Sequence, residues 1–212
     1  MPYIELDGKR ILYVHVPKTG GTSVETWLAG LAPIRFRTVG IPAALNCTPQ
    51  HLRFEDLEAL FGEGAFDYAF MTVRNPFDRI ASEFRMQARM AGEGFFGEAP
   101  RFGPWLERML ARAERDPWVL DNHLRPQWEF QGEGVEVFRL EDGLGTILAR
   151  VAEQIGVAAP EKVEHALKTA GDGRARGLPP VRWTRPALRR IRSFYAGDFD
   201  EFGYPETPPG LA

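Results

Sequence analysis

The chain has 212 residues, 44% of them hydrophobic, which suits one globular domain over residues 1–212 with a core of ordinary size. Its net charge is −3, and no apolar run is long enough to cross a bilayer, so neither a nucleic-acid partner nor a membrane span is expected. The single cysteine, Cys47, excludes an internal disulfide framework, and the N-terminus lacks the layout of a signal peptide. We therefore expect a cytoplasmic protein.

Strand-like and helix-like segments alternate along the sequence. Short runs of β-branched and aromatic residues predict strands at Tyr3–Leu6, Arg10–Val16, Phe66–Val73 and Val135–Leu140. Helical periodicity predicts helices after Ser23, His51 and Pro76 and at Pro104–Glu114, Leu144–Ile155, Glu161–Ala170 and Pro186–Tyr195. Loops are expected at Ala32–Pro49, Ala91–Gly103, Asp116–Gly134 and Gly171–Pro180. This alternation is typical of an α/β domain with a mainly parallel sheet.

The stretch Pro17–Ser23, which reads PKTGGTS, follows the second expected strand and opens a helix. Its paired glycines, Gly20 and Gly21, permit a tight turn, and a helix start presents backbone N–H groups and a positive dipole to an anion. Lys18 adds a mobile positive charge, although it precedes the glycines and so does not match a Walker A motif. The stretch predicts a site for phosphate or a related oxyanion.

A second interpretation of this stretch is purely structural. Thr22 and Glu25 have the spacing of a capping box, in which the two side chains bind the first backbone amides of a helix. Such a box would compete with an anion for the same amides. Capping alone explains neither Lys18 nor the paired glycines, so we favour the anion site.

A second loop, VRNPFDRIAS, begins where the third expected strand ends. Arg74 stands at that strand exit, which is the ligand edge of an open α/β sheet, and Ser82 follows on the next helix. One guanidinium and one hydroxyl make an adequate clamp for a terminal phosphate. The alternative is that Arg74 and Arg79 pair with Asp78 or Glu83 on a solvated surface.

Together, HVPKTGGTSV and TVRNPFDRIASEF resemble the two nucleotide-binding loops of sulfotransferases that use 3′-phosphoadenosine 5′-phosphosulfate (PAPS). The likeness is to the carbohydrate O-sulfotransferase branch, which includes heparan sulfate 2-O-sulfotransferase, and to bacterial proteins of that type. The C-terminal FYAGDFDEFGY is similar to the end of such bacterial proteins. The resemblance implies a P-loop-like, three-layer α/β/α fold with a central, mainly parallel sheet.

The resemblance also assigns roles to residues. It implies that the 5′-phosphosulfate end of PAPS is held by Lys18, Thr19, Gly20, Gly21, Thr22 and Ser23, and the 3′-phosphate by Arg74 and Ser82. Sulfuryl transfer to a hydroxyl acceptor, a carbohydrate or a small metabolite, would then leave 3′-phosphoadenosine 5′-phosphate (PAP). No metal is required in principle, and no ligand cluster has metal spacing.

The acceptor hydroxyl must lose a proton, and a neutral histidine is suited to take it. By the resemblance, His51 falls where this branch has its proposed base. His123 is a rival, because the neighbouring Asn122, Arg125, Gln127 and Trp128 could build an acceptor pocket. The other histidines are expected to be a packed residue, His15, and a surface residue, His165. Glu83 and Asp121 are weaker acid or base candidates.

Two other classes of function stay open at this point. One is a P-loop-like nucleotide kinase or NTPase, and the other is a non-catalytic nucleotide-binding or scaffold protein. The acceptor, the oligomeric state, with a homo-oligomer allowed, and the role of the basic residues Arg174 and Arg176 are beyond the sequence.

Overall fold

The structure is a computed structural model that describes residues 1–37, 40–92, 101–162 and 179–210. The chain divides into two compact units. Unit 1 takes in Met1–Arg74 and Glu129–Leu167, and unit 2 takes in Asn75–Trp128 and Lys168–Ala212. Most of the expected helix at 161–170, the basic loop with Arg174 and Arg176, and His165 lie outside the described residues.

Unit 1 contains a sheet with the strand order β1-β2-β3-β4. Its strands are β1 (Tyr3–Leu6), β2 (Lys9–Val14), β3 (Tyr68–Val73) and β4 (Val135–Arg139). β1 pairs antiparallel with β2, whereas β2, β3 and β4 run parallel to one another. The expected mainly parallel sheet is therefore confirmed, with β1 as its antiparallel edge.

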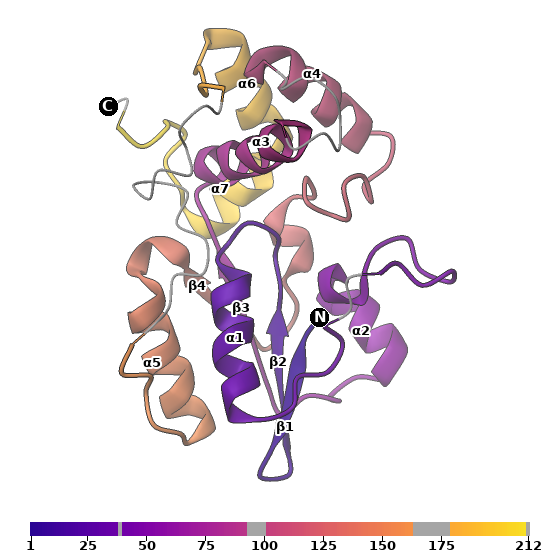
Figure 1. Cartoon of the computed structure of the whole chain (residues 1–212), viewed down its shortest axis with the longest axis vertical. Helices are drawn as coiled ribbons and strands as arrows, with labels where there is room; N and C mark the ends of the chain where they lie inside the picture. Colours follow the sequence, from indigo (N-terminus) through magenta and orange to yellow (C-terminus); the bar gives the residue numbers. More distant parts are fainter. Residues whose placement is uncertain (38–39, 93–100, 163–178, 211–212) are drawn as a thin grey trace. The chain divides into compact units, whose positions relative to one another are not determined.

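Helices flank both faces of this sheet (Figure 1). α1 (Gly21–Leu31) and α5 (Leu144–Ile155) pack on the face that carries Ile4, and their apolar residues share one core with Ile11, Tyr13 and Phe70. Successive strand residues point to opposite faces, so Tyr3 belongs to the other face. There its ring meets Phe61 of α2 (Phe54–Phe61) at 5.9 Å. The three-layer α/β arrangement follows from these contacts.

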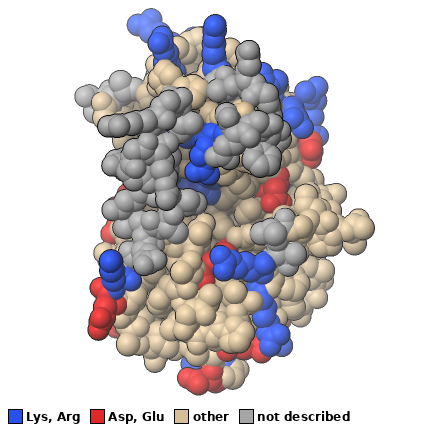
Figure 2. Space-filling view, viewed as in Figure 1, with Lys and Arg blue, Asp and Glu red and all other residues tan. Residues whose placement is uncertain are grey.

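Unit 2 is helical in its described residues, with α3 (Pro76–Gly92), α4 (Phe102–Ala113), α6 (Arg185–Phe194) and α7 (Ala196–Phe202). Aromatic rings fill its interior: Phe84 lies 5.1 Å from Phe102 and 5.2 Å from Trp105, between ring centroids. Arg190 of α6 pairs with Glu107 of α4 and with Glu114, the residue that follows that helix. In the view of Figure 2, basic side chains project from the region of α4 and α6.

The described helices other than α7 agree with the sequence expectations to within about three residues, whereas α7 was not expected as a helix. Pro76 is the first residue of α3, where its missing N–H costs nothing. The described part of the chain also contains the short 3₁₀ turns η1 (Pro49–His51), η2 (Gln127–Phe130) and η3 (Leu140–Asp142). The aromatic C-terminal segment, expected to pack on the domain, forms α7, in which Phe199 and Phe202 are buried.

Candidate active site

We call residues 17–23 of unit 1, the end of the loop between β2 and α1 together with the start of α1, the anion cradle, after the oxyanion site that the sequence predicts there. Gly20 caps α1 with φ of 94° and no side-chain cap forms, so the first backbone N–H groups of the helix are not claimed by a side-chain cap. Lys18 also has a positive φ, 72°, which is rare for a residue with a side chain. The buried Thr19 hydroxyl donates to the carbonyl oxygen of Val16 at 2.8 Å and fixes the turn.

The capping-box interpretation is wrong. Because Gly20 is the N-cap, Thr22 lies inside the helix and Glu25 falls beyond the capping position. The Glu25 carboxylate is 1% exposed and bonds instead to His15, to Gln50 at 2.7 Å and to Arg37 at 2.9 Å. Burial alone would raise the pKa of Glu25, but the His15 hydrogen bond and the charges around it lower the pKa overall.

Gly21 has a steric reason to be glycine. A Cβ atom at Gly21 would collide with the His15 ring, at 2.5 Å from both Cδ2 and Cε1. The backbone at the start of α1 is therefore bare, and it rests directly on the imidazole of His15. His15 is buried, as expected, and is also a hydrogen-bonded part of the loop's support.

Arg74 connects the second motif to the first within unit 1. It follows β3, the parallel neighbour of β2, and its Nη1 atom donates to the carbonyl oxygen of Lys18 at 3.4 Å. Parallel strands present their carboxyl ends at one sheet edge, which is why two motifs far apart in sequence meet there. The structure thus brings Lys18 and Arg74 together.

His51 lies beside this loop in unit 1. It ends η1 and is 8% exposed, and its ring meets that of His15 edge-on, with centroids 5.0 Å apart and an interplanar angle of 87°. Thr48 Oγ1 lies 3.4 Å from Nδ1 of His51. His15 directly follows β2, so His51 stands at the same sheet edge as Lys18.

Ser82 and His123 belong to unit 2. Ser82 lies on α3 and is 9% exposed. His123 Nδ1 hydrogen-bonds Glu83 Oε2 at 2.7 Å, and the other oxygen of this buried carboxylate accepts from Gln87 at 2.8 Å. Glu83 thus links His123 to Gln87 through its two carboxylate oxygens, and this chain of contacts restrains the orientation of the His123 ring.

The backbone around His123 is unusual. Leu120, Asp121 and Asn122 all have a left-handed φ, between 54° and 64°. Arg79 holds this segment by donating from Nη2 to the carbonyl oxygen of His123 at 3.0 Å and from Nη1 to that of Arg125 at 2.9 Å. Arg79 is 2% exposed, so its expected alternative, pairing on a solvated surface, is wrong.

The residues expected to build an acceptor pocket separate into two kinds. Asn122, Arg125 and Gln127 are buried. Arg125 Nε donates to Asn122 Oδ1 at 2.9 Å, and Gln127 Nε2 donates to Asp198 at 3.1 Å. Trp128 is 48% exposed. In this structure the three buried residues hold the loop, and Trp128 presents a ring to solvent.

Asp198 of α7 is a buried carboxylate that the sequence did not single out. It accepts hydrogen bonds from Gln127 and from the backbone N–H of Trp128. Burial raises the pKa of Asp198 to about 6, although the charge of Arg79 and these hydrogen bonds oppose the rise. The only sequence signal was an acidic residue within an aromatic run.

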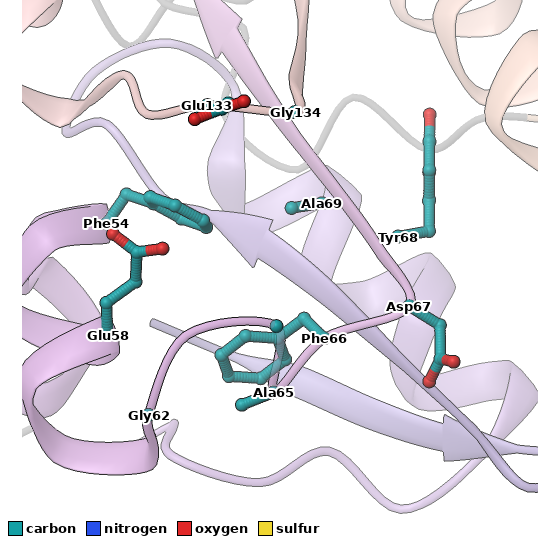
Figure 3. A pocket seen from close by; sticks show the side chains of 11 residues that line it. Phe54, Glu58, Gly62, Ala65, Phe66, Asp67, Tyr68, Ala69, Glu133 and Gly134 are labelled. Carbon is teal, nitrogen blue, oxygen red and sulfur yellow. The ribbon is translucent and has the colours of Figure 1, made fainter.

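A pocket of about 240 Å³ lies elsewhere in unit 1 (Figure 3). Phe54, Glu58 and Phe66 line it, and it reaches Tyr68, the first residue of β3. That is the opposite end of the strand from Arg74. The pocket is therefore separate from the anion cradle.

Comparison with known proteins gives one match, to a protein family. A model described as the sulfotransferase family matches residues 2–205, which is nearly the whole chain. No curated protein and no solved structure matches the chain. No helix in the described part of the chain is both long and apolar enough to cross a membrane.

Proposed function

Because the chain belongs to the sulfotransferase family, we propose that it transfers a sulfuryl group from PAPS to a hydroxyl of a carbohydrate or small metabolite. The observation that carries the proposal is the contact of Arg74 with Lys18 beside an α1 start that no side chain caps. In PAPS the sulfuryl group is attached to the 5′-phosphate, which is the leaving group of the transfer. The cytoplasm is the compartment we propose, since Cys47 is the only cysteine.

The cradle suits the 5′-phosphate end of such a nucleotide. The residues from Thr19 to Ser23 would hold this phosphate with backbone N–H groups, because the N-cap residue Gly20 has no side chain to cap the helix and Gly21 has none that would block it. Lys18 stabilises the negative charge that develops on the departing phosphate. Arg74, with Ser82, binds the 3′-phosphate.

The reaction needs positioning and one proton acceptor. A bond forms between the acceptor oxygen and sulfur as the bond between sulfur and the phosphate oxygen breaks, and the acceptor proton passes to a histidine. His51 is our first candidate for this base because it lies beside the cradle in unit 1. His123 is the second, supported by its buried partner Glu83. No metal is required by this chemistry.

The test is a thermal-shift comparison of PAP with Mg-ATP. We expect PAP without magnesium to raise the melting temperature more than Mg-ATP does, and Lys18→Ala to abolish turnover of PAPS. Equal or greater stabilisation by Mg-ATP would favour the nucleotide kinase. Tight PAP binding without transfer to a panel of sugars and phenols would favour a non-catalytic protein.

A further inference from the structure

We infer that Glu25 is a positioning residue that holds His51 in a fixed place beside the phosphate cradle. Glu25 acts through His15 and Gln50 and does not itself touch either substrate. The inference rests on the proposed function, because His51 is the proposed base, but its structural core can be tested without any substrate.

The first step is the set of partners that Glu25 collects. Its carboxylate bonds to the His15 imidazole, which follows β2, to the Gln50 amide of η1 and to the Arg37 guanidinium. These partners come from three separate parts of the chain: just after β2, the loop after α1, and η1. One buried carboxylate on α1 therefore ties three segments to the helix that forms the cradle.

The second step is the position of the His15 ring. On one side its Nδ1 atom bonds to Glu25. On another side the ring supports the backbone of Gly21, where a Cβ would meet Nε2, Cδ2 and Cε1. The ring of His51 stands edge-on to it at 5.0 Å. His15 is thus a spacer between the cradle and the proposed base, and Glu25 fixes its rotation.

The third step concerns η1, the short turn that carries His51. Gln50 Nε2 donates to Glu25 Oε1 at 2.7 Å and lies 3.2 Å from Nδ1 of His15. Gln50 is bonded covalently to His51, so its side chain anchors the turn next to the base. A turn of three residues has little rigidity of its own, which makes such an anchor necessary.

The fourth step is the charge of Glu25. A carboxylate that is 1% exposed would be costly without compensation, yet its pKa is lowered rather than raised. Burial opposes this lowering, and the His15 hydrogen bond, Gln50 and Arg37 outweigh it. An ionised group held this way in the interior has a defined geometry, which suits a positioning role.

The experiment compares Glu25→Gln with wild type in two readouts. The first is ¹⁵N NMR of the histidine rings, assigned with His15→Gln and His51→Gln. Glu25→Gln replaces the carboxylate with a weaker, uncharged acceptor, so it should shift the Nδ1 signal of His15 away from that of a charge-assisted hydrogen bond and shift the resonances of His51. The second readout is turnover of PAPS with water as acceptor, for which kcat should fall about 10–100-fold while PAP affinity changes little.

A double-mutant test separates positioning from simple stabilisation. In a His51→Ala background, Glu25→Gln should lower kcat no further, because residues that act as a unit are not additive. Gln50→Ala, which keeps the Glu25–His15 bond, should reproduce most of the loss. Glu136→Gln is the matched control, since that carboxylate accepts from Tyr68 at 2.6 Å within unit 1 but lies outside this network.

Two results would overturn the inference. The first is that the His51 resonances are unchanged by Glu25→Gln. The second is that Glu25→Gln lowers kcat by the same factor in the His51→Ala background as in wild type, which would make the two effects independent. Failure of the proposed function looks different: PAP would not bind wild type, while the NMR response of His15 and His51 to Glu25→Gln would still be seen.

Discussion

Arg74 donates a hydrogen bond from Nη1 to the backbone carbonyl oxygen of Lys18 at 3.4 Å, although the two residues are 56 positions apart. The bond joins the ends of the parallel strands β2 and β3. It places a guanidinium beside the loop that carries Lys18. The two motifs thus meet at one sheet edge, as the proposed binding of a ligand with two phosphates requires.

Arg74→Lys should therefore weaken PAP binding although it preserves the charge. An arginine can donate to the Lys18 carbonyl oxygen with one nitrogen while its other nitrogens bind phosphate. The single ammonium group of a lysine at position 74 lacks this planar, multidentate geometry. Loss of one charge-assisted contact corresponds to about tenfold or more in affinity, measured by isothermal titration calorimetry. Arg150→Lys, an exposed residue paired with Glu136, is the control. Equal affinities of Arg74→Lys and wild type would rule out a phosphate contact.

Gly21→Ala should damage both the fold and the cradle. The new Cβ would collide with His15, and His15 cannot turn away without breaking its bond to Glu25. We expect a loss of about 1–3 kcal/mol in the free energy of unfolding, from urea titration, together with weaker PAP binding.

Gly30→Ala is the matched control for that change. It lies on the same helix, where a Cβ would meet no atom within 4 Å. Alanine is the better helix former, so this variant should be about 0.5–1 kcal/mol more stable than wild type. If both alanine variants behaved alike, the packing of His15 against Gly21 would not be the reason for glycine there.

Much of the fold was predictable because its elements have clear local patterns. β2 is apolar from Ile11 to Val14 and β3 is apolar except for Thr72, as buried parallel strands are, and α5 begins and ends at the expected residues. The glycine turn was predictable for the same reason: paired glycines indicate a turn with unusual backbone angles, and Gly20 indeed has a positive φ.

The supports of the site were not predictable, because they depend on contacts between distant residues. Thr22 and Glu25 match a capping box locally, but Gly20 starts the helix too early for it, and Glu25 finds partners 10 and 25 positions away. From the sequence, Arg79 could be a surface residue. In the structure it is held by hydrogen bonds to two carbonyl oxygens, those of His123 and Arg125, beside the left-handed backbone segment. No periodicity signals such a loop.

Arg79→Met should destabilise the protein strongly. It would leave the carbonyl oxygens of His123 and Arg125 buried without their donor, at a cost of about 1–3 kcal/mol for each. Chemical denaturation measures the loss. Arg108→Ala, an exposed residue of α4, should change stability by less than about 0.5 kcal/mol. A structural role for Arg79 would be refuted if the two variants were equally stable.

His51→Ala should lower kcat for PAPS turnover by about 10²–10⁴-fold and leave PAP affinity intact, as removal of a general base does. His123→Ala tests the rival, and Glu83→Gln should follow His123→Ala in direction, because Glu83 orients that ring. A large loss for His123→Ala with none for His51→Ala would move the base to unit 2.

Asp198→Asn should change how stability depends on pH. The folded pKa of Asp198 is about 6, above its ordinary value of 3.8, because burial disfavours the charged form. Between these values the unfolded chain binds fewer protons than the folded one, so the carboxylate makes the free energy of unfolding fall as pH rises. Above the folded pKa, Asp198 is ionised in both the folded and the unfolded chain, so its contribution to the free energy of unfolding no longer changes with pH.

The uncharged amide of the Asp198→Asn variant would escape this loss. From about pH 4.5 to about pH 7.5 wild type should lose about 2 kcal/mol relative to the variant, in urea titrations of both proteins. The amide oxygen can still accept from Gln127 or from the backbone of Trp128, so the variant is expected to fold. Parallel pH profiles for the two proteins would show that Asp198 has an ordinary pKa and that burial does not govern its ionisation.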